Sequence, residues 1–175
     1  MDRVKSDGDN DTANPLDWEE WLAAYGGRFL LFARQQARCE ADARDLVQEA
    51  VVEAWQRQGD GRPPPPALVF SRIRLRAMDQ ARAADRRAAR ESAAAGGNPE
   101  PWFDGSIEER ERQRLIEDAM RGLPAIYREV ITLKIWGELT FKEIATVLGI
   151  PANTAASRYR YGLAELRKRM KEAVT

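Results

Sequence analysis

The sequence predicts an all-α protein made of two small helical domains joined by a flexible linker. Apolar residues recur at spacings of three and four, and the 175 residues contain no run of alternating β-branched residues bounded by hairpin turns. Residues 93–105 include the run Ala-Ala-Ala-Gly-Gly-Asn-Pro-Glu-Pro, a composition typical of flexible linkers. We therefore expect a disordered N-terminus over residues 1–14, an N-terminal module over 15–92 and a C-terminal module over 106–175.

Three helices are predicted in the N-terminal module, over about residues 16–38, 42–58 and 67–92. The Gly59-Asp60-Gly61 turn ends the second helix, because glycine readily adopts the backbone conformations of a tight turn. Four consecutive prolines at positions 63–66 lack backbone N–H groups, so they favour a stiff extended loop before the third helix.

Four helices with short turns are predicted in the C-terminal module, over about residues 106–121, 125–136, 140–148 and 153–171. Two helix starts have capping-box spacing, namely Ser106 with Glu109 and Thr140 with Glu143. Gly149 is expected to end the third of these helices, and Asn153 is the expected N-cap of the last.

The residue inventory excludes several classes of protein. There is no histidine, and Cys39 is the single cysteine. One thiol cannot form an intramolecular disulfide, and the common zinc sites and histidine-based catalytic triads cannot be assembled. We therefore predict a protein that is not an enzyme and holds no metal or cofactor. The polar N-terminus and the short apolar runs predict a cytoplasmic protein without membrane insertion.

The net charge is zero, but its sign alternates along the chain. Residues 1–60 carry 7 basic and 13 acidic side chains, and residues 61–90 carry 8 and 2. Residues 91–120 carry 3 and 8, and residues 121–175 carry 10 and 5. Two basic blocks separated by acidic ones suit a chain that touches a polyanion at two places, although solvated helix faces would also produce this pattern.

The first basic block lies on the predicted helix over residues 67–92. A helical wheel places on one side the apolar residues Phe70, Ile73, Ala77, Ala81, Ala84 and Ala88. Opposite them lie Arg72, Arg76, Arg82, Arg86 and Arg90. Only Asp79 and Asp85 could pair with these arginines inside the helix, so the arginine row suits a phosphate backbone. A solvated surface helix is the competing interpretation.

The second basic block has the spacing of a helix-turn-helix. Ala145 is small enough for close helix approach, Gly149 allows the tight turn, and the last helix has an apolar face that contains Ala155, Tyr159, Leu163, Leu166 and Met170. The side chains that can donate to phosphates or base edges are Asn153, Thr154, Ser157, Arg158 and Arg160. Two helices packed in an ordinary bundle would share this spacing.

Two stretches resemble the extracytoplasmic-function group of bacterial RNA polymerase sigma factors. The first, over residues 43–55, is Ala-Arg-Asp-Leu-Val-Gln-Glu-Ala-Val-Val-Glu-Ala-Trp and resembles the family's region 2 helix that docks on core polymerase. The second includes Leu-Pro-Ala-Ile-Tyr-Arg-Glu-Val at 123–130 and continues through residues 140–158, and it is similar to region 4. Both stretches in this order, joined by an acidic linker in a short chain, are far more specific than a helix-turn-helix alone.

The resemblance implies a role for each set of residues. Asp45, Gln48 and Glu49 would face core polymerase, whereas Leu46, Val47, Val51 and Trp55 would be core residues. The loop over residues 59–66 would capture a flipped base of the minus-ten element. The resemblance assigns Arg74, Asp79 and Arg82 to the family's DNA-facing helix, although the wheel places Arg74 beside the apolar face. With the arginines of the basic helix and the loop, the expected minus-ten set is Arg62, Arg72, Arg74, Arg76, Asp79, Arg82 and Arg86. The implied minus-thirty-five set is Asn153, Thr154, Ser157, Arg158, Arg160 and Tyr161.

Some positions depart from the family pattern. The family often has asparagine at the position of Leu75, lysine at that of Ala156 and arginine at that of Tyr161, and the four-proline loop is unusual. These departures bear on the promoter sequence more than on the function. The linker carboxylates Glu100 and Asp104 resemble a family segment that enters the polymerase cleft, but a plain solvated linker would have the same composition.

The main hypothesis is therefore a transcription initiation factor that binds core RNA polymerase and directs it to specific promoter DNA. An anti-sigma factor is a further partner that the resemblance allows. The alternative is a polymerase-independent helix-turn-helix regulator, which would bind duplex DNA tightly without core polymerase. A helical adaptor or a metal-dependent nuclease has less support, because no carboxylate spacing gathers a two-metal site.

Overall fold

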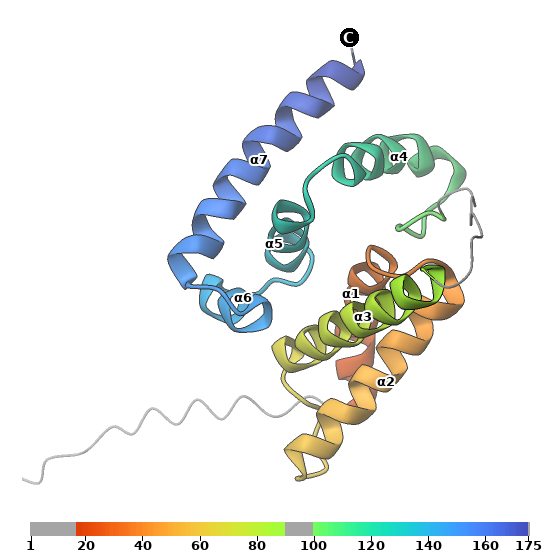
Figure 1. Cartoon of the computed structure of the whole chain (residues 1–175), viewed down its shortest axis with the longest axis vertical. Coiled ribbons are helices and arrows are strands. Elements are labelled where there is room, and N and C mark those ends of the chain that lie inside the picture. The colour runs from red at the N-terminus through yellow and green to blue at the C-terminus, as the bar shows by residue number, and fades with distance from the viewer. Residues whose placement is uncertain (1–16, 90–99, 175) are drawn as a thin grey trace, which may run out of the picture.

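A computed structural model describes residues 17–89 and 100–174 of the chain, and these residues form seven α-helices and no strand (Figure 1). The all-α prediction is confirmed. The predicted disordered N-terminus, the last residues of the predicted third helix (90–92) and residues 93–99 of the predicted linker lie outside the described residues. Within the described ranges, no helix is long and apolar enough to cross a membrane.

The N-terminal module consists of α1 (Trp18–Arg34), α2 (Glu40–Gln58) and α3 (Pro66–Ala88). The predicted first helix is too long by one turn, because the chain bends between Arg34 and Glu40 to start α2. Gly59 ends α2 in the left-handed region at φ 74°, as the turn requires. The last of the four prolines, Pro66, is already helical, since the first helical position needs no N–H donor.

The C-terminal module consists of α4 (Ile107–Arg121), α5 (Ala125–Ile135), α6 (Phe141–Leu148) and α7 (Ala152–Val174). The second predicted capping box is formed, since the Thr140 N–H donates to Glu143 at 2.7 Å and the Glu143 N–H donates back to Thr140 Oγ1 at 3.2 Å. Gly149 ends α6 at φ 65°. Helix α7 begins one residue before the predicted N-cap, so Asn153 lies in its first turn.

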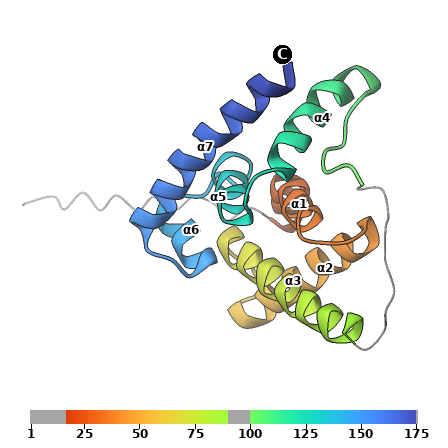
Figure 2. The same ribbon diagram turned by 45° about the horizontal axis from the view of Figure 1, so that its top comes forward.

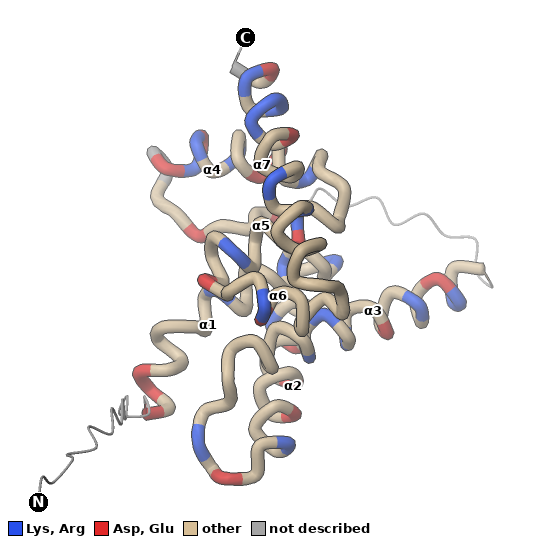
Figure 3. The backbone as a smooth tube through the Cα atoms, turned by 90° about the vertical axis from the view of Figure 1, so that its left-hand side faces the viewer, with Lys and Arg blue, Asp and Glu red and all other residues tan. Residues whose placement is uncertain are grey.

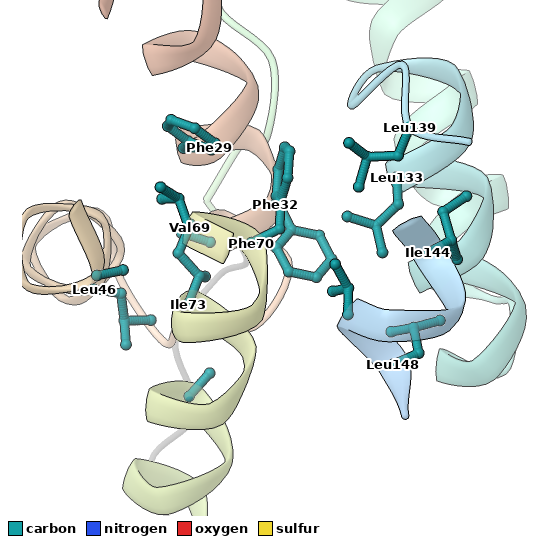
Figure 4. Packing of buried hydrophobic residues seen from close by; sticks show 14 of the residues in the cluster. Phe29, Phe32, Leu46, Val69, Phe70, Ile73, Leu133, Leu139, Ile144 and Leu148 are labelled. Carbon is teal, nitrogen blue, oxygen red and sulfur yellow. The ribbon is translucent and has the colours of Figure 1, made fainter. Parts of the chain in front are cut away.

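The core of the N-terminal module is built from aromatic and aliphatic side chains of its three helices (Figure 4). The Phe70 ring of α3 meets the Phe29 and Phe32 rings of α1 edge to face, with centroids 4.9 and 5.5 Å apart. Ile73 packs beside Phe70, and Leu46 of α2 closes the cluster. The apolar face predicted for α3 is buried only in its first half, because Ala81 and Ala88 are exposed where the helix extends beyond its neighbours.

The two modules pack against each other in one continuous apolar cluster (Figure 4). Helix α6 lies on α3, and α5 touches α1 (Figure 2). Three polar contacts cross the same boundary: Arg28 with Glu138 at 2.7 Å, Arg74 with Glu129 at 3.0 Å, and the Thr132 hydroxyl with Gln35 at 2.9 Å. Periodicity within single helices contains no information about this packing.

Candidate nucleic-acid interface and polymerase-binding face

The six residues of the expected minus-thirty-five set lie together on the N-terminal part of α7. Asn153, Arg160 and Tyr161 are exposed, whereas Thr154, Ser157 and Arg158 are half-buried. Ala155 is fully buried and fixes the opposite side of the helix against α6 and the rest of the core. The Arg160 guanidinium lies 5.5 Å from the Tyr161 ring centroid. The helix therefore presents a cationic and aromatic surface outward from the core.

The proline loop forms one wall of an open pocket of about 520 Å³. Its other wall is aromatic, formed by Trp21 and Tyr25 of α1, and Gln58, Asp60 and Arg62 border it. The indole N–H of Trp18 donates to the Gly61 carbonyl at 3.1 Å and so ties the loop to α1. An aromatic wall with a few polar groups at the edge has the chemistry needed to hold a planar base. Sequence reasoning identified the loop but not its partners from α1.

Asp60 organises this loop. Its carboxylate accepts the Arg62 backbone N–H at 3.0 Å and the Gln58 amide at 2.7 Å. The hydrogen bond from the Arg62 backbone, followed by the one from Gln58, lowers the pKa of Asp60. The loop keeps its shape through these bonds and through Gly59 and Gly61, which both have positive φ.

The arginines near the middle of α3 are paired by acids from other helices. Glu53 of α2 accepts from Arg72 at 3.1 Å and from Arg76 at 3.0 Å. Burial acts to raise the pKa of Glu53, but the hydrogen bond from Arg76 and the nearby guanidinium charges lower it overall. Glu49 also binds Arg76. The expectation that these arginines lack acidic partners is therefore wrong, because the helical wheel counted only partners within the same helix.

Arg74 faces away from the other α3 arginines and toward the C-terminal module. Its side chain is 22% exposed and binds Glu129 of α5, which is 16% exposed. This geometry explains why the wheel placed Arg74 beside the apolar face, since α6 packs on α3 and Arg74 reaches Glu129 of α5 across the boundary between the modules.

The outer half of α3 carries the freely exposed part of the expected minus-ten set (Figure 3). Asp79, Arg82 and Arg86 are all exposed there, and Arg82 lies 3.7 Å from Asp79. Arg62 is exposed on the proline loop, at the other end of α3. The expected minus-ten residues therefore fall into an accessible group and a paired group, and they do not form one uniform row.

The expected polymerase-binding residues share one exposed face of α2. Asp45, Gln48 and Glu49 are exposed and border a shallow groove of about 430 Å³. Val52 and Trp55 continue this face and are 45% and 41% exposed. The expectation that Trp55 belongs to the core is therefore wrong. Trp55 follows Gln48 by seven residues, nearly two helical turns, so its position on the exposed face could have been predicted.

Comparison with known families identifies both modules. Residues 21–87 match the family described as Sigma-70 region 2, and residues 113–173 match the family described as Sigma-70, region 4. The chain is 33% identical over 135 residues to the ECF RNA polymerase sigma factor SigL of Mycobacterium tuberculosis, covering 75% of this chain and 76% of the relative. It is 29% identical over 159 residues to RNA polymerase sigma-E factor of Streptomyces avermitilis, covering 89% and 86%.

Solved structures share the fold. The sigma factor RpoE, in a co-crystal structure with the anti-sigma factor NepR from Bartonella quintana, matches with a TM-score of 0.65 at 20% identity, covering 88% of this chain and 96% of that one. CnrH, in complex with the cytosolic domain of CnrY, matches with a TM-score of 0.60 at 23% identity, covering 88% and 87%. Both regions thus occur in the family's order along one chain, and the chain belongs to the extracytoplasmic-function family of RNA polymerase sigma factors.

Proposed function

We propose that the chain is a transcription initiation factor that binds core RNA polymerase and directs it to specific promoters. The observation that carries this conclusion is the match of region 2 and region 4 in order, with the basic face of α7 exposed. The chain supplies binding surfaces and performs no covalent chemistry, and it acts in the cytoplasm where core polymerase is found.

The exposed face of α2 binds core polymerase. Its polar side chains Asp45, Gln48 and Glu49 form a rim, and Val52 and Trp55 add apolar area beside them. Interfaces of this kind draw much of their affinity from a few aromatic anchors surrounded by polar groups. Trp55 is the natural anchor, because its indole is large and substantially accessible.

The minus-ten element binds the N-terminal module as an opened strand. A base that leaves the stack can enter the pocket between the proline loop and the aromatic wall of Trp21 and Tyr25. Arg62 at the loop and Arg82 and Arg86 on the outer half of α3 then contact the strand's phosphates. Arg74 can join them only if it leaves Glu129.

The minus-thirty-five element binds α7 as duplex DNA. The N-terminal turns of this second helix of the helix-turn-helix enter the major groove, with Arg160 and Asn153 as the exposed donors. Ser157, Thr154 and Arg158 lie closer to the module and suit phosphate contacts that set the register.

An anti-sigma factor is the proposed regulatory partner. Two structural neighbours were solved as complexes, RpoE with the anti-sigma factor NepR and CnrH with the cytosolic domain of CnrY. The shared fold supports the same class of partner for this chain, and co-purification from the native cell would identify it.

Reconstituted transcription tests the proposed function. Purified core polymerase, the chain and genomic promoter fragments should give transcripts from a defined set of start sites, and core polymerase alone should not. A mobility-shift assay distinguishes this function from the alternative, a polymerase-independent regulator. A sigma factor should bind promoter DNA weakly until core polymerase is added, whereas the regulator should bind duplex DNA tightly alone. Tight duplex binding without core polymerase, together with no specific transcript, would overturn the proposal.

Variants of α2 test the polymerase-binding face. Val52→Ala and Trp55→Ala should weaken core polymerase binding in a pull-down titration while leaving thermal unfolding nearly unchanged, because both side chains are already exposed. Leu22→Ala is the matched control, since Leu22 is 49% exposed on α1. Equal loss of binding in the control would contradict the assignment of this face.

A further inference from the structure

Residues 100–104, Glu-Pro-Trp-Phe-Asp, contact both modules just before α4 begins (Figure 2). We refer to this segment as the strap. It belongs to the predicted linker, yet Trp102 is only 4% exposed. Its neighbours in one cluster include Leu31 of α1 from the N-terminal module and Met120, Ile131 and Leu166 from the C-terminal module. A linker residue thus fills a space to which both modules contribute.

The strap is fixed firmly to the C-terminal module. The buried carboxylate of Glu117 on α4 accepts the backbone N–H groups of Trp102 at 2.8 Å and Phe103 at 2.9 Å. The Arg121 guanidinium lies 4.1 Å from the centroid of the Trp102 ring. These partners follow the strap by fewer than about twenty residues, so closing this loop costs little conformational entropy. The strap therefore moves with α4.

The strap binds the N-terminal module through hydrogen bonds that involve charged groups. Arg34 at the end of α1 donates to the Trp102 carbonyl at 2.8 Å and to both oxygens of Asp104 at 3.1 and 3.2 Å. Glu100 accepts the backbone N–H of Glu40 at 2.6 Å, at the positive end of α2. These bonds join residues that lie 60 to 70 positions apart in the sequence, so they hold the N-terminal module against the strap.

Glu40 orients the Arg34 side chain for its contacts with the strap. The Arg34 side chain is 10% exposed, and it donates to both oxygens of Glu40, at 2.8 and 2.9 Å. The hydrogen bond from Arg34 lowers the pKa of Glu40 to about 2. Glu40 therefore stays charged and keeps the guanidinium aimed at the strap throughout the neutral range.

The packing of the two modules against each other affects Arg74, one of the expected minus-ten residues. While α5 and α6 lie on the N-terminal module, the Glu129 carboxylate forms an ion pair with the Arg74 guanidinium at 3.0 Å, and α6 packs on α3. A DNA phosphate can reach Arg74 only by displacing that carboxylate, because the two anions compete for one guanidinium.

We propose that the strap holds the free protein closed and so keeps Arg74 from promoter DNA until the modules separate. The inference rests on the proposed role of Arg74 in binding the minus-ten strand. It assigns Glu100 and Asp104 an intramolecular role in the free chain, as the acids that hold the N-terminal module against the strap.

Energy transfer between two labels tests the closure. Cys39 is first replaced by serine, which is a favoured N-cap and should be tolerated because the Cys39 side chain makes no capping hydrogen bond. Labels at Ala23→Cys on α1 and Ala164→Cys on α7 then report the distance between the modules, since both positions are exposed. The full chain is used throughout.

The main variant is the pair Glu100→Gln and Asp104→Asn, which removes both strap carboxylates without opening a cavity. The Asp104 side chain is 85% exposed. The matched control is the pair Glu111→Gln and Asp118→Asn, which makes the same charge change at exposed positions of α4. Trp102→Ala is the stronger variant, and its folding is checked by circular dichroism.

The strap variants should show a new population with low energy transfer, larger in Trp102→Ala, while the control matches the wild type. Their affinity for single-stranded minus-ten DNA should rise, by about tenfold if the wild type is open one-tenth of the time. Unchanged transfer in both strap variants would overturn the proposal. Opening without a gain in DNA affinity would support the strap and contradict the role of Arg74, and transcription by the wild type tests the proposed function separately.

Discussion

Helices α3 and α7 carry similar charge but hold it in different ways. Arg72 and Arg76 of α3 bind Glu53 of α2, and Arg74 binds Glu129 of α5. In the part of the chain that the structure describes, no carboxylate forms an ion pair with Arg158 or Arg160 of α7. One helix therefore has its central arginines neutralised by the protein, whereas on the other Arg160 is exposed and Arg158 is half-buried.

This difference separates the two proposed promoter contacts physically. DNA that approaches α7 meets free cations and gains affinity by releasing counterions. DNA that approaches the middle of α3 must compete with carboxylates already in place, so binding there is coupled to rearrangement of the protein. A sigma factor organised in this way would bind strand-separated DNA more weakly until another event, such as binding to polymerase, frees Arg74 from Glu129.

The largest expected effect is a difference in the free energy of unfolding between a variant on the buried side of α3 and one on the exposed side of α7. Phe70→Ala should lower the free energy of unfolding by about 3–5 kcal/mol, because Phe70 is 1% exposed and contacts two other rings. Tyr161→Ala should change it by less than about 0.5 kcal/mol, because Tyr161 is 58% exposed. Urea denaturation measures both, and equal losses would break the comparison.

A second test concerns the ion pairs themselves. Glu53→Gln should destabilise the fold by about 1–3 kcal/mol, since it leaves the largely covered guanidinium of Arg72 without its carboxylate, whereas Arg76 keeps its pair with Glu49. Glu165→Gln removes the pair with Arg169 on α7, whose side chains are 35% and 37% exposed, and should cost at most about 0.5 kcal/mol. Similar values for the two variants would show that pairing on α3 is no tighter than a surface pair.

DNA-binding measurements test whether the exposed Arg160 of α7 contacts DNA. Arg160→Ala should weaken binding to minus-thirty-five duplex by about 1–3 kcal/mol if Arg160 contacts a base edge, and it should leave core polymerase binding intact. Arg169→Ala is the control, because Arg169 lies farther along α7 and is paired with Glu165. Fluorescence anisotropy measures both, and a parallel loss of core binding would indicate misfolding.

The smallest expected effect is a pH dependence of stability. The pKa of Glu53 lies below its usual 4.5 in the folded chain, so its charge pairs contribute fully above that pH. This contribution is lost as the pH falls below 4.5 through the lowered value. Unfolding free energies measured between pH 6 and pH 3 should therefore fall less steeply in Glu53→Gln than in the wild type. Identical slopes would contradict the pairing of Glu53.

Much of the fold and part of the site could be predicted from local sequence. Glycine conformation and capping chemistry set the ends of α2 and α6 within a residue or two. The polar face of α7 follows from its apolar spacing, which is why Arg160 and Tyr161 are exposed as expected. The exposure of Trp55 was missed, although its seven-residue spacing from Gln48 contained the signal.

By itself, the sequence determined the order of the helices, the ends of α2 and α6 and the outward face of α7, because these depend on residues within a few turns of one another. Only the tertiary structure decided which arginines are free, how α6 covers α3 and where the strap lies. Those outcomes join groups such as Arg34 and Asp104, 70 residues apart. Their proximity comes from packing of apolar faces, a property of the assembled core that no single helix encodes.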